Sequence, residues 1–391
     1  MRYLISILLI SSTLLAQSAY YRLGYGDLYP TSDPLSSSLG QGMVALYDSA
    51  RATTNNAASL HDLDRVYYTV GLGSEYRSID NNVSNNTRFE HISLVVPVGK
   101  KSGLSIGAVP VADFKTYYQS EVADGTLAES SSGGIWDYHL GFGYQVSDKM
   151  SLGLKLHVLN GFLRRASSIE TGDASETYVL KGGISGRSLE LGMISQFGNK
   201  VTLGLTADIP YAMPMMDGQD SLAGTDEFIE VSEELSAWPT TIRFGLVYKQ
   251  SKRTNIIAGI GQQIFPSSGF DNAKIYALPA GWQTVPAATF QVALQRLPAD
   301  RNSRSFVRRV GYQIGASAKN YYLVSDPETF TNEYALISGI NFGLRNGKSI
   351  FDISGEIGSR AGEETLPSEL YARMKFGIQV NDIWFKKAKR R

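Results

Sequence analysis

Apolar and polar side chains alternate with a period of two along most of the chain after Val66. In 136–146, for example, even positions are apolar or aromatic, and odd positions are polar or glycine. The same alternation occupies 151–158 and 372–380. Because successive side chains of a β-strand point to opposite faces, this pattern predicts strands with one apolar face. Fourteen segments fit it: 65–77, 88–98, 103–118, 133–146, 150–164, 176–196, 201–213, 238–250, 254–266, 284–296, 307–323, 331–345, 349–360 and 368–381.

Three features favour a membrane-spanning barrel over a soluble β-sandwich, which would alternate in the same way. The segments are long, since a strand needs about 9–11 residues to cross a bilayer and globular strands average about 5–6. The polar face is rich in Gly, Ser and charges of both signs, which suits a hydrated lumen. Aromatic residues near the segment ends would form a girdle at the membrane interface: Tyr117, Tyr118, Tyr144, Trp238, Tyr248, Tyr321, Tyr322 and Trp384.

The connections between these segments alternate in length. Short turns follow five of the even-numbered strands, at Gly99–Ser102, Ser147–Lys149, Gly198–Lys200, Ser251–Arg253 and Asn346–Lys348, and a somewhat longer connection near Pro298–Arg304 follows the sixth. Connections after the odd-numbered strands are generally longer, notably 119–132, 214–237 and 267–283. Outer-membrane barrels have short periplasmic turns and long outer loops. The pattern therefore predicts an all-β, antiparallel up-and-down barrel of about fourteen strands over 65–382, with both termini in the periplasm.

The N-terminus predicts export across the inner membrane. Arg2 precedes an apolar stretch from Leu4 to Leu15, and small residues follow at Ala16 and Ser18. This is the pattern of a secretory signal peptide over 1–18, with cleavage after Ala16 or Ser18. A membrane anchor is the alternative, but the stretch is shorter than the roughly 20 apolar residues that a spanning helix needs.

The composition excludes several other classes of protein. The chain has 37 basic and 37 acidic side chains among 391 residues, so it offers no overall attraction to nucleic acid. It has no Cys, which removes disulfides, thiolate nucleophiles and cysteine-ligated metal sites. No Gly-x-Ser-x-Gly, P-loop or His-Glu-x-x-His motif occurs. We therefore expect no enzyme activity, no catalytic residue, no cofactor, no metal site and no nucleic-acid partner.

Residues 19–64 lack the alternation and form a separate unit ahead of the barrel. They are mostly small or polar, yet too apolar for a free tail. An empty fourteen-stranded lumen would be an open pore, so we expect this segment to fold into the lumen as a hatch. A flexible periplasmic extension is the alternative. At the other end of the chain, 383–391 is expected to be a basic periplasmic tail.

Short motifs in this segment resemble the hatch of the FadL-like outer-membrane transporters. That hatch has a Gly-rich stretch, an Asp, and then Asn-Pro-Ala before an apolar residue. The matching positions are Gly40, Gly42, Asp48, Asn55, Asn56 and Ala57. Asn56 stands where the family usually has Pro. The ending Ile383-Trp384-Phe385-Lys386-Lys387 is similar to that of Bacteroidetes-type members, including PorV-like proteins.

Two groups of lumenal side chains are candidate sites. If Asp148 is the centre of a three-residue turn, His139 and His157 face each other across neighbouring strands, near Asp137 and Lys155. Such a pair could be a metal or proton site, or a polar cross-strand pair in a hydrated lumen, which we favour because no third ligand is spaced for a metal. Asp48 should also need a basic or backbone N–H partner. The basic candidates on the lumen face are Lys155, Arg243, Arg373 and Lys375.

The resemblance implies an outer-membrane transporter for apolar compounds such as long-chain fatty acids, whose ligand-binding residues the sequence does not identify. A PorV-like scaffold for secretion or surface assembly is the alternative, and a diffusion porin is a third possibility that the hatch disfavours. An apolar pocket above the hatch would favour transport, whereas a lumen packed shut would favour the scaffold. Expected partners are outer-membrane lipid and lipopolysaccharide, the barrel-assembly machinery and an apolar substrate.

Overall fold

The computed structural model describes residues 18, 20, 24–29, 33, 37–47, 51–79, 82–122, 125–171, 174–222, 228–234, 238–266, 278, 281–300, 303–325, 330–344, 348–361 and 367–382. The core of the predicted signal peptide, Asp48 and the basic tail 383–391 lie outside these residues. Among the residues described, no helix is both long and apolar enough to cross a membrane.

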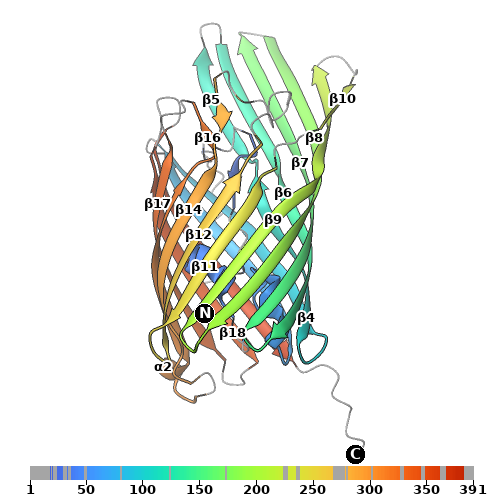
Figure 1. Ribbon diagram of the computed structural model, residues 1–391. Helices are drawn as coiled ribbons and strands as arrows, with labels where there is room; N and C mark the ends of the chain where they lie inside the picture. The colour runs from blue at the N-terminus through green and yellow to red at the C-terminus, as the bar shows by residue number, and fades with distance from the viewer. Residues whose placement is uncertain are drawn as a thin grey trace, which may run out of the picture.

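Fourteen antiparallel strands close into a barrel, as the alternation predicted (Figure 1). Closure occurs where β19 pairs with β2 and where β9 pairs with β11. The strands are β2 (Val66–Ile79), β3 (Asn82–Pro97), β4 (Ser102–Asp113), β6 (Gly125–Ser147), β7 (Met150–Thr171), β8 (Ala174–Phe197), β9 (Val201–Leu222), β11 (Thr240–Lys249), β12 (Thr254–Ile264), β14 (Ala287–Arg296), β15 (Val310–Asn320), β17 (Asn332–Gly343), β18 (Ser349–Arg360) and β19 (Glu369–Asp382).

The two faces of the wall follow the two-residue period. On β6, Tyr138 and Leu140 are exposed on the outside, while Asp137 and His139 are buried inside. On β7, Leu154 is exposed and Lys155 is buried. An apolar outer surface and a polar interior are what a bilayer requires of a barrel, because lipid cannot hydrogen-bond polar groups.

One end of the barrel carries the six connections that follow the even-numbered strands of the wall, five of them short turns, and is called the hairpin end below. At the opposite end, four neighbouring strands, β6 to β9, continue for 22 to 24 residues, about twice the length that crosses a bilayer. Two further strands, β5 (Thr116–Val122) and β10 (Phe228–Glu234), pair with β6 and β9 there (Figure 1). The long loops predicted at 119–132 and 214–237 are therefore mostly β-hairpins. The prediction was wrong because backbone pairing continues where the sequence no longer alternates clearly.

Three of the eight aromatic residues assigned to the membrane girdle lie elsewhere. Trp238, Tyr321 and Tyr322 are buried inside the barrel, whereas Tyr144 and Tyr248 are exposed on its outer face. An aromatic ring near a strand end can pack on the hatch as well as on lipid, and the sequence does not distinguish the two. Trp384 lies outside the described residues.

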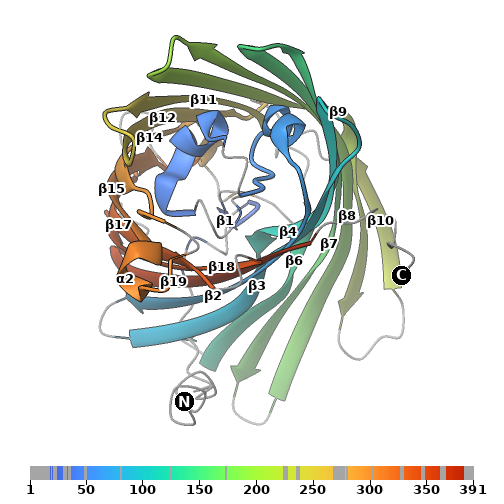
Figure 2. The ribbon, with the colours of Figure 1, turned by 90° about the horizontal axis from the view of Figure 1, so that it is seen from below.

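The segment before the barrel lies within the ring of strands (Figure 2). Its regular elements are short: β1 (Asp27–Leu28) and two 3-10 helices, η2 (Ser37–Ala45) and η3 (Ala57–Asp62). Inner-wall glycines let both helices approach the wall closely. A Cβ would meet the backbone of η3 at Gly103, Gly143 and Gly153, and the backbone of η2 at Gly204, Gly245 and Gly259. These two sets of glycines form the seats of the hatch.

Small elements complete the described fold. A four-residue helix, α2 (Phe306–Arg309), lies in the connection between β14 and β15 at the hairpin end. A two-residue pairing joins β13 (Gln283–Thr284) to β16 (Leu323–Val324). Two prolines of the wall stand at irregularities, since Pro110 adjoins a register shift in β4 and Pro210 pairs beside one in β8. These are positions where a missing ladder donor is tolerated.

Candidate functional site

The glycines of the hatch motif shape η2. Gly40 has φ 57 and ψ −142, a backbone conformation that side-chain-bearing residues rarely adopt, and it kinks the helix there. A Cβ on Gly40 would overlap the side chain of Gln291. A Cβ on Gly42 would meet Ile257 and the carbonyl of Ala258 on β12. Both positions therefore require glycine for close packing on the wall.

The asparagines of the motif tie the hatch together. Asn56 precedes η3 and accepts a hydrogen bond from the Ala58 N–H through Oδ1 at 3.0 Å. Its Nδ2 donates to the carbonyl of Val44 at the end of η2 at 2.8 Å. Asn55 donates to the carboxylate of Asp33 at 2.5 Å. Pro at 56 could make none of the side-chain bonds of Asn56, so the departure from the family motif adds links between the two helices.

The histidine pair lies as the turn at Asp148 indicates. His139 and His157 are opposite each other in the β6–β7 ladder, with ring centroids 6.1 Å apart. His157 Nδ1 lies 2.8 Å from Asp137 Oδ2, and His139 Nδ1 lies 3.9 Å from the same oxygen. Within the described part of the chain, no three His, Asp or Glu side chains are grouped so that they could hold a metal ion. The arrangement is a buried polar cluster on the inner wall.

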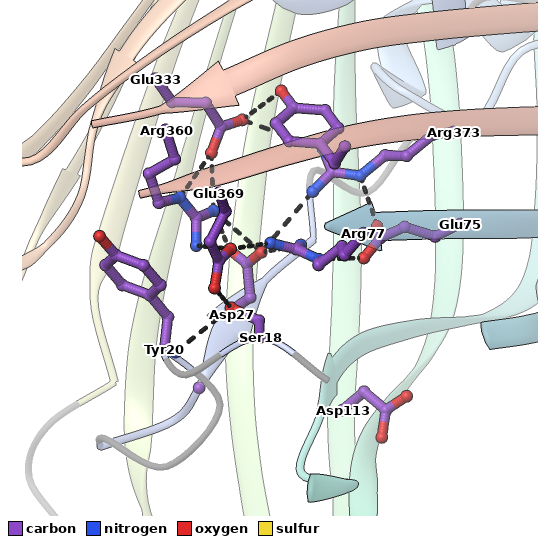
Figure 3. A network of polar contacts seen from close by, with 12 residues as sticks. Ser18, Tyr20, Asp27, Glu75, Arg77, Asp113, Glu333, Arg360, Glu369 and Arg373 are labelled. Carbon is purple, nitrogen blue, oxygen red and sulfur yellow. Dashed lines mark hydrogen bonds and ion pairs between the residues drawn. The ribbon is translucent and has the colours of Figure 1, made fainter. Parts of the chain in front are cut away.

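A second feature, which the sequence analysis missed, is a network of buried ion pairs centred on Asp27 of β1 (Figure 3). Arg77 on β2 contacts Asp27 Oδ2 at 2.8 Å, and Arg360 on β18 contacts it at 3.0 Å. Arg373 and Lys319 lie 3.6 and 3.8 Å from the same carboxylate. One hatch carboxylate thus contacts basic side chains on four strands of the wall, β2, β15, β18 and β19.

Carboxylates of the wall accept hydrogen bonds from the remaining N–H groups of these arginines. Arg360 donates to Glu333 at 2.6 Å, Arg77 to Glu369 at 2.5 Å, and Arg373 to Glu75 at 2.5 Å. The Tyr20 ring of the hatch lies 4.5 Å from the Arg360 guanidinium, a cation–π distance. Every member named is buried or nearly so, and charges are retained in such surroundings only when they are paired.

The electrostatics of Asp27 follow from these neighbours. Burial by itself would raise the pKa of the Asp27 carboxyl, because a low-dielectric environment disfavours its charged form. Arg360, Lys319, Arg77 and Arg373 outweigh burial and hold that pKa well below its usual range. Asp27 therefore stays ionised and keeps its ion pairs at neutral pH.

The basic residues that the sequence offered as partners for Asp48 are paired with carboxylates of the wall. Lys155 and Arg243 contact Glu190 at 2.9 and 2.7 Å. Lys375 contacts Glu90 at 3.2 Å, and Arg373 belongs to the Asp27 network. Asp48 itself lies outside the described residues. In the described hatch, Asp27 has the role that the sequence assigned to Asp48.

Aromatic and aliphatic side chains cover the hatch toward the opposite end of the barrel. This apolar cluster includes Tyr20, Tyr25, Trp238, Phe265 and Tyr322. The Tyr322 hydroxyl donates to the Gly26 carbonyl at 3.1 Å and accepts from the Tyr25 N–H at 2.9 Å. The cluster is formed by the protein's own side chains packed on one another.

A cavity of about 160 Å³ remains between hatch and wall. Typical ligand pockets measure about 300–1,000 Å³ and are mostly apolar. This one is lined partly by the apolar cluster and partly by charged groups, among them Asp27, Arg243, Glu333 and Arg373. Its chemistry suits a few water molecules better than an alkyl chain.

Comparison with known proteins assigns the chain to a family. A sequence model of the BamG family matches residues 2–390. The chain belongs to the BamG family. No curated protein sequence matches it.

Solved structures show that this BamG-family barrel shares its fold with a FadL homologue, a hydrocarbon channel and a toluene transporter. A FadL homologue from Pseudomonas aeruginosa is 10% identical with a TM-score of 0.61, covering 95% of this chain and 100% of that one. The monoaromatic hydrocarbon channel CymD is 13% identical with a TM-score of 0.57, covering 95% and 99%. The toluene transporter TodX from Pseudomonas putida is 12% identical with a TM-score of 0.54, covering 95% and 100%. At these identities the likeness concerns the fold.

In its described part, the wall of the BamG-family barrel has a seam between β3 and β4, and the hatch pairs with the wall there. Among the described residues, β3 pairs with β4 only from Ile92 to Pro97, so the rest of β3 is paired on one side only, with β2. Hatch strand β1 takes the free edge of β4 at Ala112 and Asp113, and the Tyr29 N–H donates to Val111 O at 2.9 Å. The Arg88 guanidinium of β3 lies 3.7 Å from the Tyr29 ring centre. The hatch is therefore part of the wall as well as of the lumen.

Proposed function

We propose that this protein is a closed, non-enzymatic scaffold barrel of the outer membrane that works with the barrel-assembly machinery. The observation that carries the proposal is the ion-pair network that joins Asp27 of the hatch to four basic side chains of the wall. The prefix of the BamG family name refers to that machinery and supports it as the partner.

Opening the lumen would be costly. Moving the hatch out separates Asp27 from Arg77 and Arg360 while both arginines stay in the wall. Leaving one partner of a buried pair alone costs about 3–5 kcal/mol. The same movement removes β1 from the β4 edge and Asn56 from the wall carbonyls of Met193 and Leu205. These losses favour a hatch that remains in place, as a scaffold requires.

We infer that the barrel lies in the outer membrane with its hairpin end in the periplasm. Its outer face is a belt of exposed apolar and aromatic side chains, and short turns are typical of the periplasmic side of such barrels. Ser18 lies buried in the lumen and donates to Glu369 at 2.7 Å. This contact supports signal-peptide cleavage after Ala16 rather than after Ser18.

Passage of apolar compounds is the second candidate function. The fold shared with TodX, CymD and the FadL homologue favours it, as does the apolar cluster around Trp238 and Tyr322 next to the cavity. Aromatic hydrocarbons or long-chain fatty acids would be the substrates. They gain about 0.8 kcal/mol per CH₂ on leaving water, which could offset a local rearrangement of that cluster.

Depletion of the protein in its host separates the two functions. The scaffold predicts that newly made outer-membrane barrels fold more slowly, visible as unfolded forms in heat-modifiability gels, while uptake of toluene and oleate is unchanged. Transport predicts the reverse pattern. Complementation with the wild-type gene should restore whichever property is lost.

A further inference from the structure

The net charge of zero conceals an unequal distribution between the two ends of the barrel. Each of the six connections at the hairpin end contains Lys or Arg in its described part: Lys100, Lys101, Lys149, Lys200, Lys252, Arg253, Arg304, Arg308, Arg309 and Lys348. In contrast, residues 213–237, which contain the β9–β10 hairpin at the opposite end, have seven acidic residues and no basic one. The acidic residues at the hairpin end include Asp64, Asp148, Asp300 and Asp382.

The connection that contains α2 has two adjacent exposed apolar side chains between arginines, whereas single exposed apolar residues such as Val98 and Phe197 adjoin the lysine turns. Val307 is 80% exposed and Phe306 is 53% exposed. Arg304 and Arg308 flank them and are also exposed. No residue of α2 is buried. A soluble surface rarely presents this combination without a partner, because exposed apolar groups cost free energy in water.

The packing of Phe306 shows on which side of the wall this connection lies. Its ring meets Phe342 of β17 edge-on at 5.4 Å, and Phe342 stacks on Phe351 of β18 at 5.5 Å. Phe342 shares its face of β17 with exposed Ile340 and Leu344, whereas the adjacent Asn341 is buried inside. The three rings therefore form an outer aromatic row at the hairpin end, where the hydrocarbon region meets the headgroups.

Hydrogen bonds fix the connection in this position. Arg309 donates through Nη1 to Gly343 O at 2.8 Å, at the end of β17. The Asp300 N–H donates to Arg308 O at 3.0 Å, which closes the segment on itself. Arg309 thus has a structural role, while the exposed Arg304 and Arg308 are held next to the aromatic row.

We propose that the α2 connection is a binding site for anionic phospholipid headgroups of the adjacent leaflet. Phe306 and Val307 would enter the acyl boundary, and Arg304 and Arg308 would bind phosphate oxygens, to which guanidinium donates well. Two observations favour lipid over a protein partner: the packing of Phe306 on the lipid-facing row, and basic residues in every connection at the hairpin end. The inference is independent of the proposed scaffold function.

Two variants and one label test the site. The chain has no Cys, so Val307→Cys can carry a single environment-sensitive fluorophore such as NBD, with Asn199→Cys in the turn between β8 and β9 as the control. In liposomes of phosphatidylcholine with 30% phosphatidylglycerol, label at 307 should be shielded from aqueous iodide and quenched by doxyl lipid, while label at 199 stays accessible to iodide. Label at 307 that remains open to iodide overturns the proposal.

Lipid selectivity gives the second readout. Native mass spectrometry should show phosphatidylglycerol retained over phosphatidylcholine by the wild type. Arg304→Gln combined with Arg308→Gln should weaken this preference by about fivefold per arginine. Lys100→Gln with Lys101→Gln, which removes the same charge from a turn without an exposed apolar pair, should weaken it less. Equal retention by wild type and the arginine variant overturns the proposal, as does shielding of residue 307 that occurs only when purified assembly machinery is added.

Discussion

The Arg360 guanidinium donates to the Asp27 carboxylate at 3.0 Å across 333 residues of sequence. Asp27 belongs to the hatch and Arg360 to strand β18 of the wall, so this contact joins two parts that alternation alone cannot relate. Because both groups are buried, each depends on the other for charge compensation. The position of the hatch therefore depends on contacts with the wall that form only when the barrel is closed.

Asp27→Ala should loosen the hatch without unfolding the barrel. The substitution removes one carboxylate partner from Arg77 and one from Arg360. The free energy that holds the hatch against the wall should fall by about 3–5 kcal/mol. Planar-bilayer recordings should show new conductance, while heat-modifiability gels show a folded barrel. Asp382→Asn, which alters an exposed ion pair with Lys348, is the control and should remain silent. A silent Asp27→Ala would mean that the network does not hold the hatch.

Acid should release the hatch only at low pH. The pKa of Asp27 is held well below its usual value of 3.8 by Arg360 and its basic neighbours. A lowered folded-state pKa contributes stability that is present above the unfolded-state value and lost as pH falls through the folded-state value. Conductance of the wild type should therefore stay flat from pH 7 to about 4.5 and rise only below the ordinary Asp pKa. A rise in conductance near pH 6 would contradict the lowered pKa of Asp27.

The glycine seats predict a position-specific effect of added side chains. Gly153→Val should displace η3, because a Cβ there meets the backbone of Ala57 and Ala58. Overpacking of this kind costs about 1–3 kcal/mol. Gly183→Val is the matched control, since nothing lies within 4 Å of its Cβ position. Protease accessibility of the hatch should rise for the first variant only.

Asn56→Ala tests the link between the two helices of the hatch. The substitution removes the cap on η3 and the bond from Nδ2 to Val44 O, with an expected local cost of about 1 kcal/mol. Hydrogen exchange at the Ala58 and Ser59 amides should accelerate about fivefold, since 1.4 kcal/mol is tenfold. Asn199→Ala, in an exposed turn, should leave these amides unchanged. If the exchange rates in Asn56→Ala are unchanged, packing of η3 on the wall is sufficient to keep the helix ordered.

The outer face should reject charge. Leu154 is exposed on the lipid side of β7, and Arg there should cost about 2–4 kcal/mol near the bilayer midplane. Equilibrium unfolding from liposomes measures the loss. Arg at Ser147, the last residue of β6 at the hairpin end, should cost little. Similar losses at both positions would contradict the assignment of the lipid face.

The sequence predicted those features that depend on local pattern. The two-residue period located all fourteen wall strands and their faces, because alternation is a direct consequence of strand geometry. The turn at Asp148 gave the pairing of His139 with His157, since a short hairpin determines register. Strand ends were less accurate, because β6 to β9 continue as paired strands well beyond the bilayer thickness.

Long-range contacts of the lumen could not be predicted in this way. Alternation indicates that Arg77, Glu333 and Arg360 face inward, but not which of them meet around a closed barrel. Gln379 illustrates the limit, because alternation predicts only that it faces inward. Its side chain donates to Ala52 O at 2.8 Å and accepts from Ala52 N–H at 3.2 Å, so substitution there would disturb the hatch.

Conductance and solute flux through the purified wild-type protein in liposomes test the closed lumen most directly. Proteoliposomes should show no ion conductance above that of empty liposomes and no faster entry of toluene or oleate, whereas Asp27→Ala should conduct ions. Rapid entry of either apolar solute through the wild type, with the hatch network intact, would contradict the scaffold proposal and favour transport.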